Sequence, residues 1–188
     1  MSNTLNHQTS LYLKQHAEQP VHWQRWSDET LAEAKSADRP IFLSIGYAGS
    51  HWCQVMSRES FNDPITAQVL NTHFCCIKVD REERPDLDKV YLSAMQLLTR
   101  HGGGWPLNLF LDPQTQLPFF AGTYFPADTQ NGQPGFADLL MRLHEAYDQQ
   151  REELTGQSDK LANTLQQLSS PVLDPKMTDE ALIDSCRE

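Results

Sequence analysis

The chain has 188 residues and a formal net charge of −10, enough length for one domain with a proper core. The acidic balance argues against nucleic acid or an anionic membrane as partners, because both select basic patches. No apolar run approaches the ~20 residues of a membrane span, and residues 1–6 lack the segments of a secretory signal. Four cysteines without regular spacing are typical of a reducing compartment, so we expect a cytoplasmic protein.

The first half of the chain predicts two buried strands joined by a helix. An aromatic-rich start is expected to pack over a sheet edge. Ile41–Ile45 is an apolar, strand-like run, and a turn with glycines leads from it into a helix expected over Val55–Leu70. Phe74–Asp80 is rich in strand formers and predicts the second strand, with Cys75 and Cys76 on opposite faces in the core.

The second half predicts a helix, a hairpin and a closing helix. Pro85 suits a first helical turn, and apolar residues follow at helical spacing as far as Leu98. Strands are expected over Leu107–Leu111 and Phe119–Phe125, with a turn between them. A helix over residues 136–153 completes the order β-α-β-α-β-β-α. That order predicts an α/β thioredoxin-like fold, in which helices flank a central mixed sheet.

Ser50-His51-Trp52-Cys53 lies where a thioredoxin-type fold carries its Cys-x-x-Cys motif, between a strand and a helix. At that place the helix N-terminus stabilises a thiolate. Here the first position is a serine, whose hydroxyl cannot form a disulfide. The sequence therefore keeps the scaffold of a dithiol site but only its second sulfur, on Cys53.

Several longer stretches, in the same order, resemble the N-terminal thioredoxin-like domain of the spermatogenesis-associated, YyaL-type family. The resemblance covers about residues 5–126. It includes Pro40-Ile41-Phe42-Leu43-Ser44-Ile45-Gly46-Tyr47, His51-Trp52-Cys53, Lys78-Val79-Asp80-Arg81-Glu82-Glu83-Arg84-Pro85-Asp86, Gly103-Gly104-Trp105-Pro106-Leu107-Asn108 and Gly122-Thr123-Tyr124-Phe125-Pro126.

This chain departs from the family at the motif itself. The family pattern reads Cys-His-Trp-Cys-His, whereas this chain has Ser50 at the first position and Gln54 at the last. Because a single engineered substitution would not remove the histidine as well, we interpret the change as natural divergence. The resemblance supports the fold, but a dithiol activity does not carry over to this chain.

Two loops are expected to accompany the motif. Trp105-Pro106 opens the third predicted core strand, where the thioredoxin fold has its cis-proline facing the redox motif. The mixed-charge run that follows the second strand should neighbour the motif at the same sheet edge, either as a binding surface or as a structural ion-pair network. The candidate binding residues are thus His51, Trp52, Asp80, Arg81, Glu82, Trp105 and Pro106, while Cys53 is a possible catalytic residue and Ser50 marks the lost thiol.

We expect no cofactor and no metal. Cys53, His51, His22 and His16 could in principle converge on zinc, but the sequence has no paired C-x-x-C or H-x-x-x-H spacing.

The last quarter of the chain has a different character. We expect one domain over residues 1–155, including the N-terminal extension, and a helical connector over residues 156–188. A polar helix over Gln157–Leu168 ends before Pro171, and a second helix begins near Thr178, carries Cys186 and reaches Glu188 without a stop signal. Since family members typically continue into a large α-helical domain, that domain is an expected partner of this chain.

Two functions remain open at this stage. One is a redox-degenerate module that binds a partner or packs on the helical domain. The other is a monothiol thiol-disulfide oxidoreductase that uses Cys53 in mixed disulfides with proteins or small thiols. The missing first sulfur favours the binding module.

Overall fold

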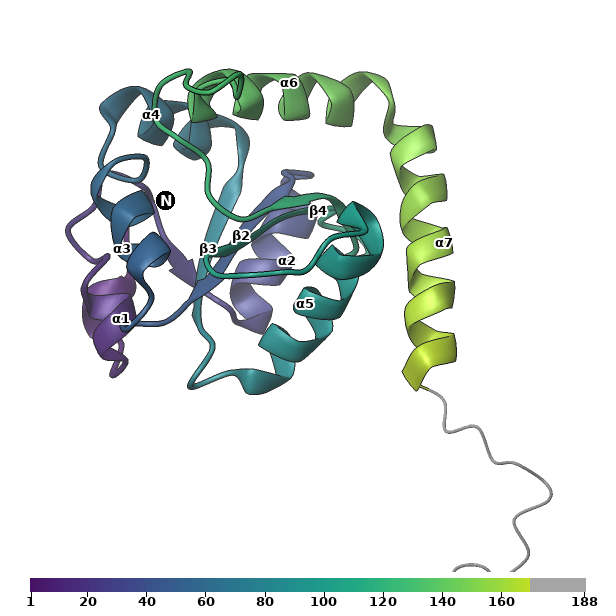
Figure 1. Ribbon diagram of the computed structural model, residues 1–188, viewed down its shortest axis with the longest axis horizontal. Coiled ribbons are helices and arrows are strands. Elements are labelled where there is room, and N and C mark those ends of the chain that lie inside the picture. Colours follow the sequence, from purple (N-terminus) through teal and green to yellow (C-terminus); the bar gives the residue numbers. More distant parts are fainter. Residues whose placement is uncertain (170–188) are drawn as a thin grey trace, which may run out of the picture.

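The computed structural model describes residues 1–169, which form a five-stranded sheet covered by helices on both faces (Figure 1). The strand order is β1-β3-β2-β4-β5, in which β1, β3 and β2 are parallel while β4 and β5 run antiparallel to their neighbours. The strands are β1 (Gln24–Arg25), β2 (Ile41–Gly46), β3 (Cys75–Asp80), β4 (Leu107–Leu111) and β5 (Pro118–Gly122). This is the mixed sheet of a thioredoxin-like fold, as the sequence predicted.

The helices divide between two apolar clusters, one on each face of the sheet. They are the 3-10 helix η1 (Leu5–His7), α1 (Leu11–Lys14), α2 (Asp28–Ser36), α3 (His51–Arg58), α4 (Pro64–His73), α5 (Pro85–Thr99), α6 (Phe136–Gln149) and α7 (Arg151–Ser169). Residues of α1, α3, α4 and α6 pack with Cys76 on one face, and residues of α2 and α5 pack with Cys75 on the other. The alternation of β3 thus places its two cysteines in opposite halves of the core, as expected.

The helix predicted over Val55–Leu70 is wrong, because two helices occupy this stretch. Helix α3 begins earlier, at His51, and ends at Arg58, and α4 begins at Pro64. Proline is favoured in a first helical turn, where its missing N–H costs nothing. The Asp63 carboxylate accepts a hydrogen bond from the Thr66 N–H at 2.7 Å and caps the new helix.

The domain boundary predicted at residue 155 falls inside a continuous helix. Helix α6 ends at Gln149, and α7 runs from Arg151 to Ser169 along α5 and β5. Its Ser158 and Leu161 side chains are buried, because the apolar side of α7 faces the domain. The second predicted helix near Thr178, with Cys186, lies outside the described residues. None of the helices in residues 1–169 is long and apolar enough to cross a membrane.

Candidate functional site

Ser50 caps the helix that carries the motif. It follows β2 and is 6% exposed, and its Oγ accepts a hydrogen bond from the Cys53 N–H at 3.3 Å. Serine is among the favoured N-cap residues, since its short side chain satisfies one of the unpaired N–H groups of a first turn. The position expected for an attacking thiol thus has a structural hydroxyl.

Cys53 points into the protein. Its side chain is 1% exposed and packs over Gly46, the last residue of β2. A Cβ atom added at Gly46 would lie 2.7 Å from Cys53 Sγ and nearer still to the Tyr12 hydroxyl oxygen. Glycine at this position therefore allows the thiol and the phenol to meet above the end of the strand.

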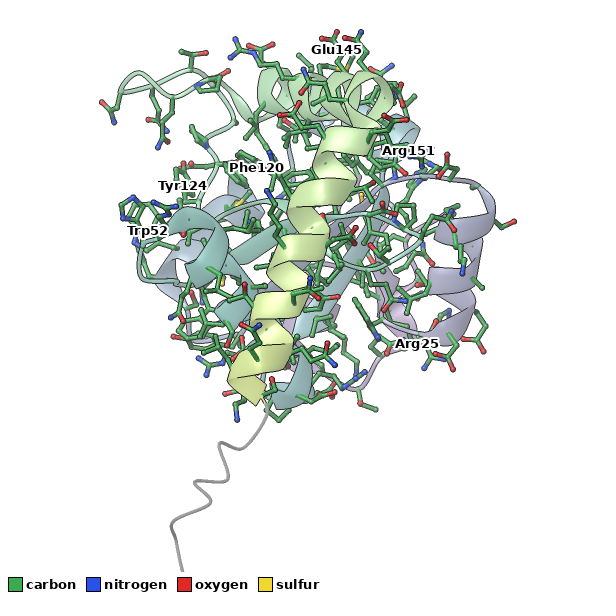
Figure 2. The ribbon with its side chains drawn as sticks, turned by 90° about the vertical axis from the view of Figure 1, so that its right-hand side faces the viewer. Arg25, Trp52, Phe120, Tyr124, Glu145 and Arg151 are labelled. Carbon is green, nitrogen blue, oxygen red and sulfur yellow. The ribbon has the colours of Figure 1, made fainter. Side chains whose placement is uncertain are left out.

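The neighbouring motif residue, Trp52, points outward. Its side chain is 53% exposed, and its ring centroid lies 5.1 Å from that of Tyr124. Figure 2 shows the two side chains together at one edge of the molecule. They line a pocket of about 270 Å³, which we call the aromatic pocket; its lining residues are Trp52, Gly104, Trp105, Thr123 and Tyr124.

Trp105 forms a fixed wall of the aromatic pocket. Its indole N–H donates a hydrogen bond to Asp88 Oδ1 at 2.7 Å, and the Arg81 guanidinium stacks 3.9 Å from its ring centroid. Arg81 Nε also lies 3.3 Å from Asp88 Oδ2. The Trp105–Pro106 peptide bond is cis, and Pro106 is buried. The Asp88 carboxylate therefore holds both the Trp105 indole and the Arg81 guanidinium that stacks on it.

The rest of the charged loop faces elsewhere. Asp80 is buried and accepts hydrogen bonds from Ser10 Oγ at 2.6 Å and from the Glu82 N–H at 2.9 Å, which ties the N-terminal segment to β3. Arg84 pairs with Asp86 at the surface and, by hydrogen bonding, lowers the pKa of that carboxyl to about 2. Neither Asp80 nor Glu82 lines the aromatic pocket; Arg81 reaches it through Trp105.

Lys78 is a site residue that sequence reasoning missed. Alternation along β3 places Cys76, Lys78 and Asp80 on the face that α1 and α3 cover. The Lys78 side chain is 1% exposed, which is rare for lysine. The sequence did carry a signal for a buried lysine, because Lys78 stands between the apolar residues Ile77 and Val79 inside a predicted strand.

The surroundings of the Lys78 ammonium group are mostly apolar. Its Nζ donates a hydrogen bond to Ser44 Oγ at 3.0 Å on the neighbouring strand. Burial lowers the pKa of Lys78 from 10.5 to about 7, and the nearby Cys53 thiol partly offsets that effect. Three aromatic rings face the ammonium, with centroids at 4.3 Å for Phe61, 4.7 Å for Trp23 and 5.4 Å for Tyr12.

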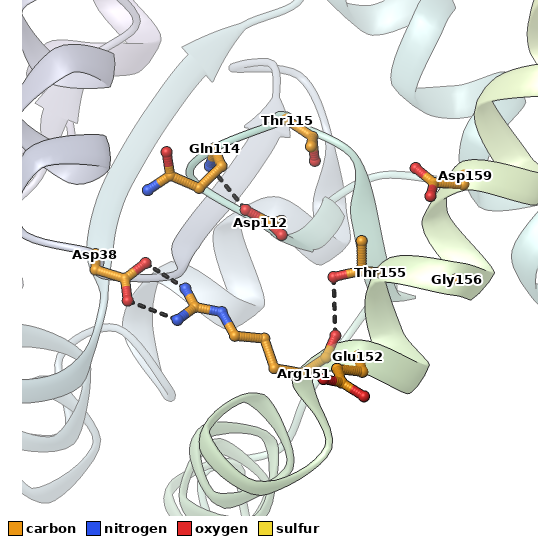
Figure 3. A pocket seen from close by; sticks show the side chains of 9 residues that line it. All are labelled: Asp38, Asp112, Gln114, Thr115, Arg151, Glu152, Thr155, Gly156 and Asp159. Carbon is orange, nitrogen blue, oxygen red and sulfur yellow. Dashed lines mark hydrogen bonds and ion pairs between the residues drawn. The ribbon is translucent and has the colours of Figure 1, made fainter.

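A further pocket, of about 780 Å³, lies at the start of α7, well away from Trp52 (Figures 2 and 3). Arg151 pairs there with Asp38, and this contact lowers the pKa of the Asp38 carboxyl. The other charged lining residues are the acids Asp112, Glu152 and Asp159, and the lining holds no cysteine, histidine or serine. The arrangement anchors α7 and offers no nucleophile of the kind expected at the motif.

Metal binding has no geometric support in the part of the chain that the structure describes. Residues 1–169 contain no group of three or more His, Cys, Asp or Glu side chains placed to hold an ion.

The fold and the motif helix define this chain as a thioredoxin-like protein. It belongs to the thioredoxin-like, DsbH-type family described as "Protein of unknown function, DUF255", whose model matches residues 2–166.

Curated relatives share this region. Spermatogenesis-associated protein 20 of Homo sapiens is 44% identical over 163 residues, which are 87% of this chain and 20% of the relative. An uncharacterized protein of Caenorhabditis elegans is 43% identical over 164 residues, 87% of this chain and 22% of the relative. The chain thus spans about a fifth of the length of the curated relatives it matches.

Two solved structures have a similar backbone arrangement. The structure titled "DsbH Oxidoreductase" is 16% identical with a TM-score of 0.48, covering 69% of this chain and 85% of that one. A thioredoxin from Thermus thermophilus is 22% identical with a TM-score of 0.43, covering 68% and 87%.

Proposed function

We propose that this chain is a redox-degenerate thioredoxin-like module that binds a partner through the aromatic pocket. The observation that supports this proposal is the orientation of the motif helix. It presents the Trp52 indole to solvent at 53% exposure and turns the Cys53 thiol inward at 1%. Direct disulfide exchange between Cys53 and a protein would need this thiol at the surface.

The absence of a second sulfur supports the same function. Dithiol turnover requires a thiolate that attacks and a neighbouring thiol that resolves the mixed disulfide. Ser50 supplies neither, and its hydroxyl already caps α3. Cys75 and Cys76 lie in the strand core, where burial raises the pKa of each thiol, so they are poor substitutes.

The aromatic pocket has the features of a contact site. Aromatic side chains contribute most to interfaces when a rigid, apolar pocket receives them. Trp105 is held by Asp88 and Arg81, and Tyr124 is held by its hydroxyl, which donates to Glu59 Oε2 at 2.6 Å. The Trp52 side chain makes no hydrogen bond among those found in the described residues and is free to cover an apolar side chain of a partner.

The proposed partner is the helical region that the family resemblance predicts beyond this segment. The matched segment is about a fifth of each relative, so most of those chains lies outside it. A module joined to a large neighbour can use an exposed aromatic pocket to pack against it at high effective concentration.

A monothiol oxidoreductase is the second candidate, and the buried Lys78 favours it. A lysine next to a thiol stabilises the thiolate. Yet Cys53 is too deeply buried for a protein disulfide to reach, so this function would be restricted to small substrates.

Affinity measurements with matched variants test the binding module. The chain would be titrated against the separately produced C-terminal region of a longer relative. Trp52→Ala should weaken binding about tenfold or more and leave the melting temperature nearly unchanged. Ile65→Ala, which removes an even more exposed apolar side chain from α4, should leave both unchanged. Equal affinities for Trp52→Ala and the unaltered chain would contradict the proposal, as would insulin reduction above background.

A further inference from the structure

A second pocket reaches Cys53 from the inner side of the motif helix. It measures about 240 Å³ and lies between α1 and α3, on Tyr12, Gln15, His16, Cys53, Gln54, Ser57 and Arg58. We call it the thiol pocket. It shares no lining residue with the aromatic pocket, which uses Trp52 on the same helix. Helix α3 therefore separates two sites of different character.

Two buried polar atoms in the lining of the thiol pocket have no hydrogen-bond partner. Tyr12 and His16 are each 2% exposed, and the unpartnered atoms are the Tyr12 hydroxyl oxygen and His16 Nε2. Buried polar groups in proteins are nearly always paired, so two such atoms beside a thiol point to a ligand.

The hydrogen-bonding roles of these atoms follow from their neighbours. His16 Nδ1 lies 2.7 Å from the Tyr12 carbonyl oxygen, which can only accept, so Nδ1 carries the proton and Nε2 presents a lone pair. Burial, aided by the charge of Lys78, lowers the pKa of His16 to about 2 and keeps the ring neutral. Burial and the adjacent Cys53 raise the pKa of Tyr12, so its hydroxyl keeps its proton as a donor.

Lys78 places a buried positive charge behind the thiol. None of the ion pairs found in residues 1–169 includes Lys78, although its side chain is buried. Its Nζ donates a hydrogen bond to Ser44 Oγ, and both Lys78 and Cys53 lie against Tyr12. A protonated lysine near a thiol favours the thiolate, which is the nucleophilic form.

We propose that the thiol pocket is a reaction site for small hydroperoxides, with Cys53 as the nucleophile. This reaction goes beyond the binding function proposed for the aromatic pocket and does not depend on it.

Size and hydrogen bonding select this class of substrate. A pocket of about 240 Å³ admits a molecule of a few heavy atoms and excludes a protein disulfide. A hydroperoxide offers an O–H donor to His16 Nε2 and oxygen acceptors to the Tyr12 hydroxyl. A disulfide has no donor and would leave the imidazole nitrogen unpaired.

The reaction balances without a further reactant. The Cys53 thiolate attacks the terminal oxygen of ROOH, a sulfur–oxygen bond forms and the oxygen–oxygen bond breaks. The alkoxide that leaves takes up the proton that the Cys53 thiol released. The sulfur is oxidised to the sulfenic acid, Cys53–SOH, and the hydroperoxide is reduced to ROH.

The experiment uses the whole chain and hydrogen peroxide as oxidant, and mass spectrometry counts the peptides in which each cysteine has gained oxygen. Cys53 should be oxidised about tenfold faster than Cys75 or Cys76, which are as deeply buried but line no pocket described here. The bulkier cumene hydroperoxide should react much more slowly than hydrogen peroxide. Oxidation of Cys53 no faster than that of Cys75, or no preference for the smaller oxidant, would overturn the proposal.

A variant tests the effect of the Lys78 charge. Lys78→Met should slow Cys53 oxidation about tenfold at neutral pH, because the uncharged side chain no longer favours the thiolate. Ile65→Ala is the control and should react like the unaltered chain. If Lys78→Met does not fold, methyl methanethiolsulfonate on the unaltered chain replaces it. This small reagent should modify Cys53 far faster than the bulky DTNB does, and equal rates would refute the pocket route.

Discussion

Replacing Lys78 with methionine should stabilise the protein, and the gain should shrink as the pH rises above neutral. Burial lowers the pKa of Lys78 from 10.5 to about 7 in the folded state. Between about pH 7 and 10.5 the unfolded chain holds a proton that the folded chain has lost, so the stability of the unaltered protein rises with pH in this window. Below about pH 7 both states are charged, and the full penalty of burial applies.

The magnitude follows from the same two values. The difference between 10.5 and about 7 corresponds to a penalty of roughly 5 kcal/mol at low pH. Between pH 7 and pH 9, linkage recovers about 2 kcal/mol of it. Methionine has a similar length and carries no charge. Its loss of the Ser44 hydrogen bond and of the contacts with the aromatic rings should be nearly independent of pH.

Urea denaturation at pH 7 and at pH 9 measures this effect. The difference in unfolding free energy between Lys78→Met and the unaltered chain should be about 2 kcal/mol more favourable to the variant at pH 7 than at pH 9. Lys89→Met, which changes an exposed lysine on α5, should show no such trend. The same difference at both pH values would show that Lys78 keeps its charge in the fold and would refute the reasoning.

Three other changes have definite outcomes. Ser50→Cys should form a disulfide with Cys53 under mild oxidation, because thioredoxin-like geometry sets compatible Cβ positions. The disulfide would be seen as a mass loss of two hydrogens, and persistently free thiols at both positions would contradict this prediction. Gly46→Ala should cost about 1–3 kcal/mol of stability, since its Cβ would crowd Cys53 Sγ and the Tyr12 hydroxyl. Gly49→Ala, whose Cβ has only ordinary contacts, is its control, and equal melting temperatures would show that the site relaxes. Arg81→Ala should cost about 1 kcal/mol, because the Arg81 side chain is 35% exposed and Asp88 still holds Trp105. A loss of several kcal/mol would indicate a structural network instead.

Strands β2, β3 and β4 were predictable to within about a residue. Each is a short apolar run bounded by turn residues, and buried strands have that pattern. Helix α5 was predictable because Pro85 opens it and apolar residues repeat at helical spacing. The break between α3 and α4 was missed because the apolar pattern continues across it, although Asp63 and Pro64 carry the signal of a new helix.

The two pockets differed in how far the sequence could predict them. Trp52 lies in the first turn of α3 and Trp105 lies in the loop before β4, and the fold alone brings these two segments together. The contact of Tyr12 with Cys53 depends on how the N-terminal segment packs, through bonds such as the one from Ser10 to Asp80. Such a contact between distant residues has no periodicity, and the burial of Lys78 beneath it could not be read from β3 alone.

Hydroxyl-radical footprinting tests the proposed contact surface most directly. The chain would be labelled alone and in complex with the C-terminal region of a longer relative, and the oxidation of each exposed side chain would be compared. Trp52, 53% exposed in the free chain, should become strongly protected, while Val90 and Ile65, 54% and 66% exposed, should be labelled equally in both states. Unchanged oxidation of Trp52 in a complex that protects other surfaces would show that the aromatic pocket is not where this module binds.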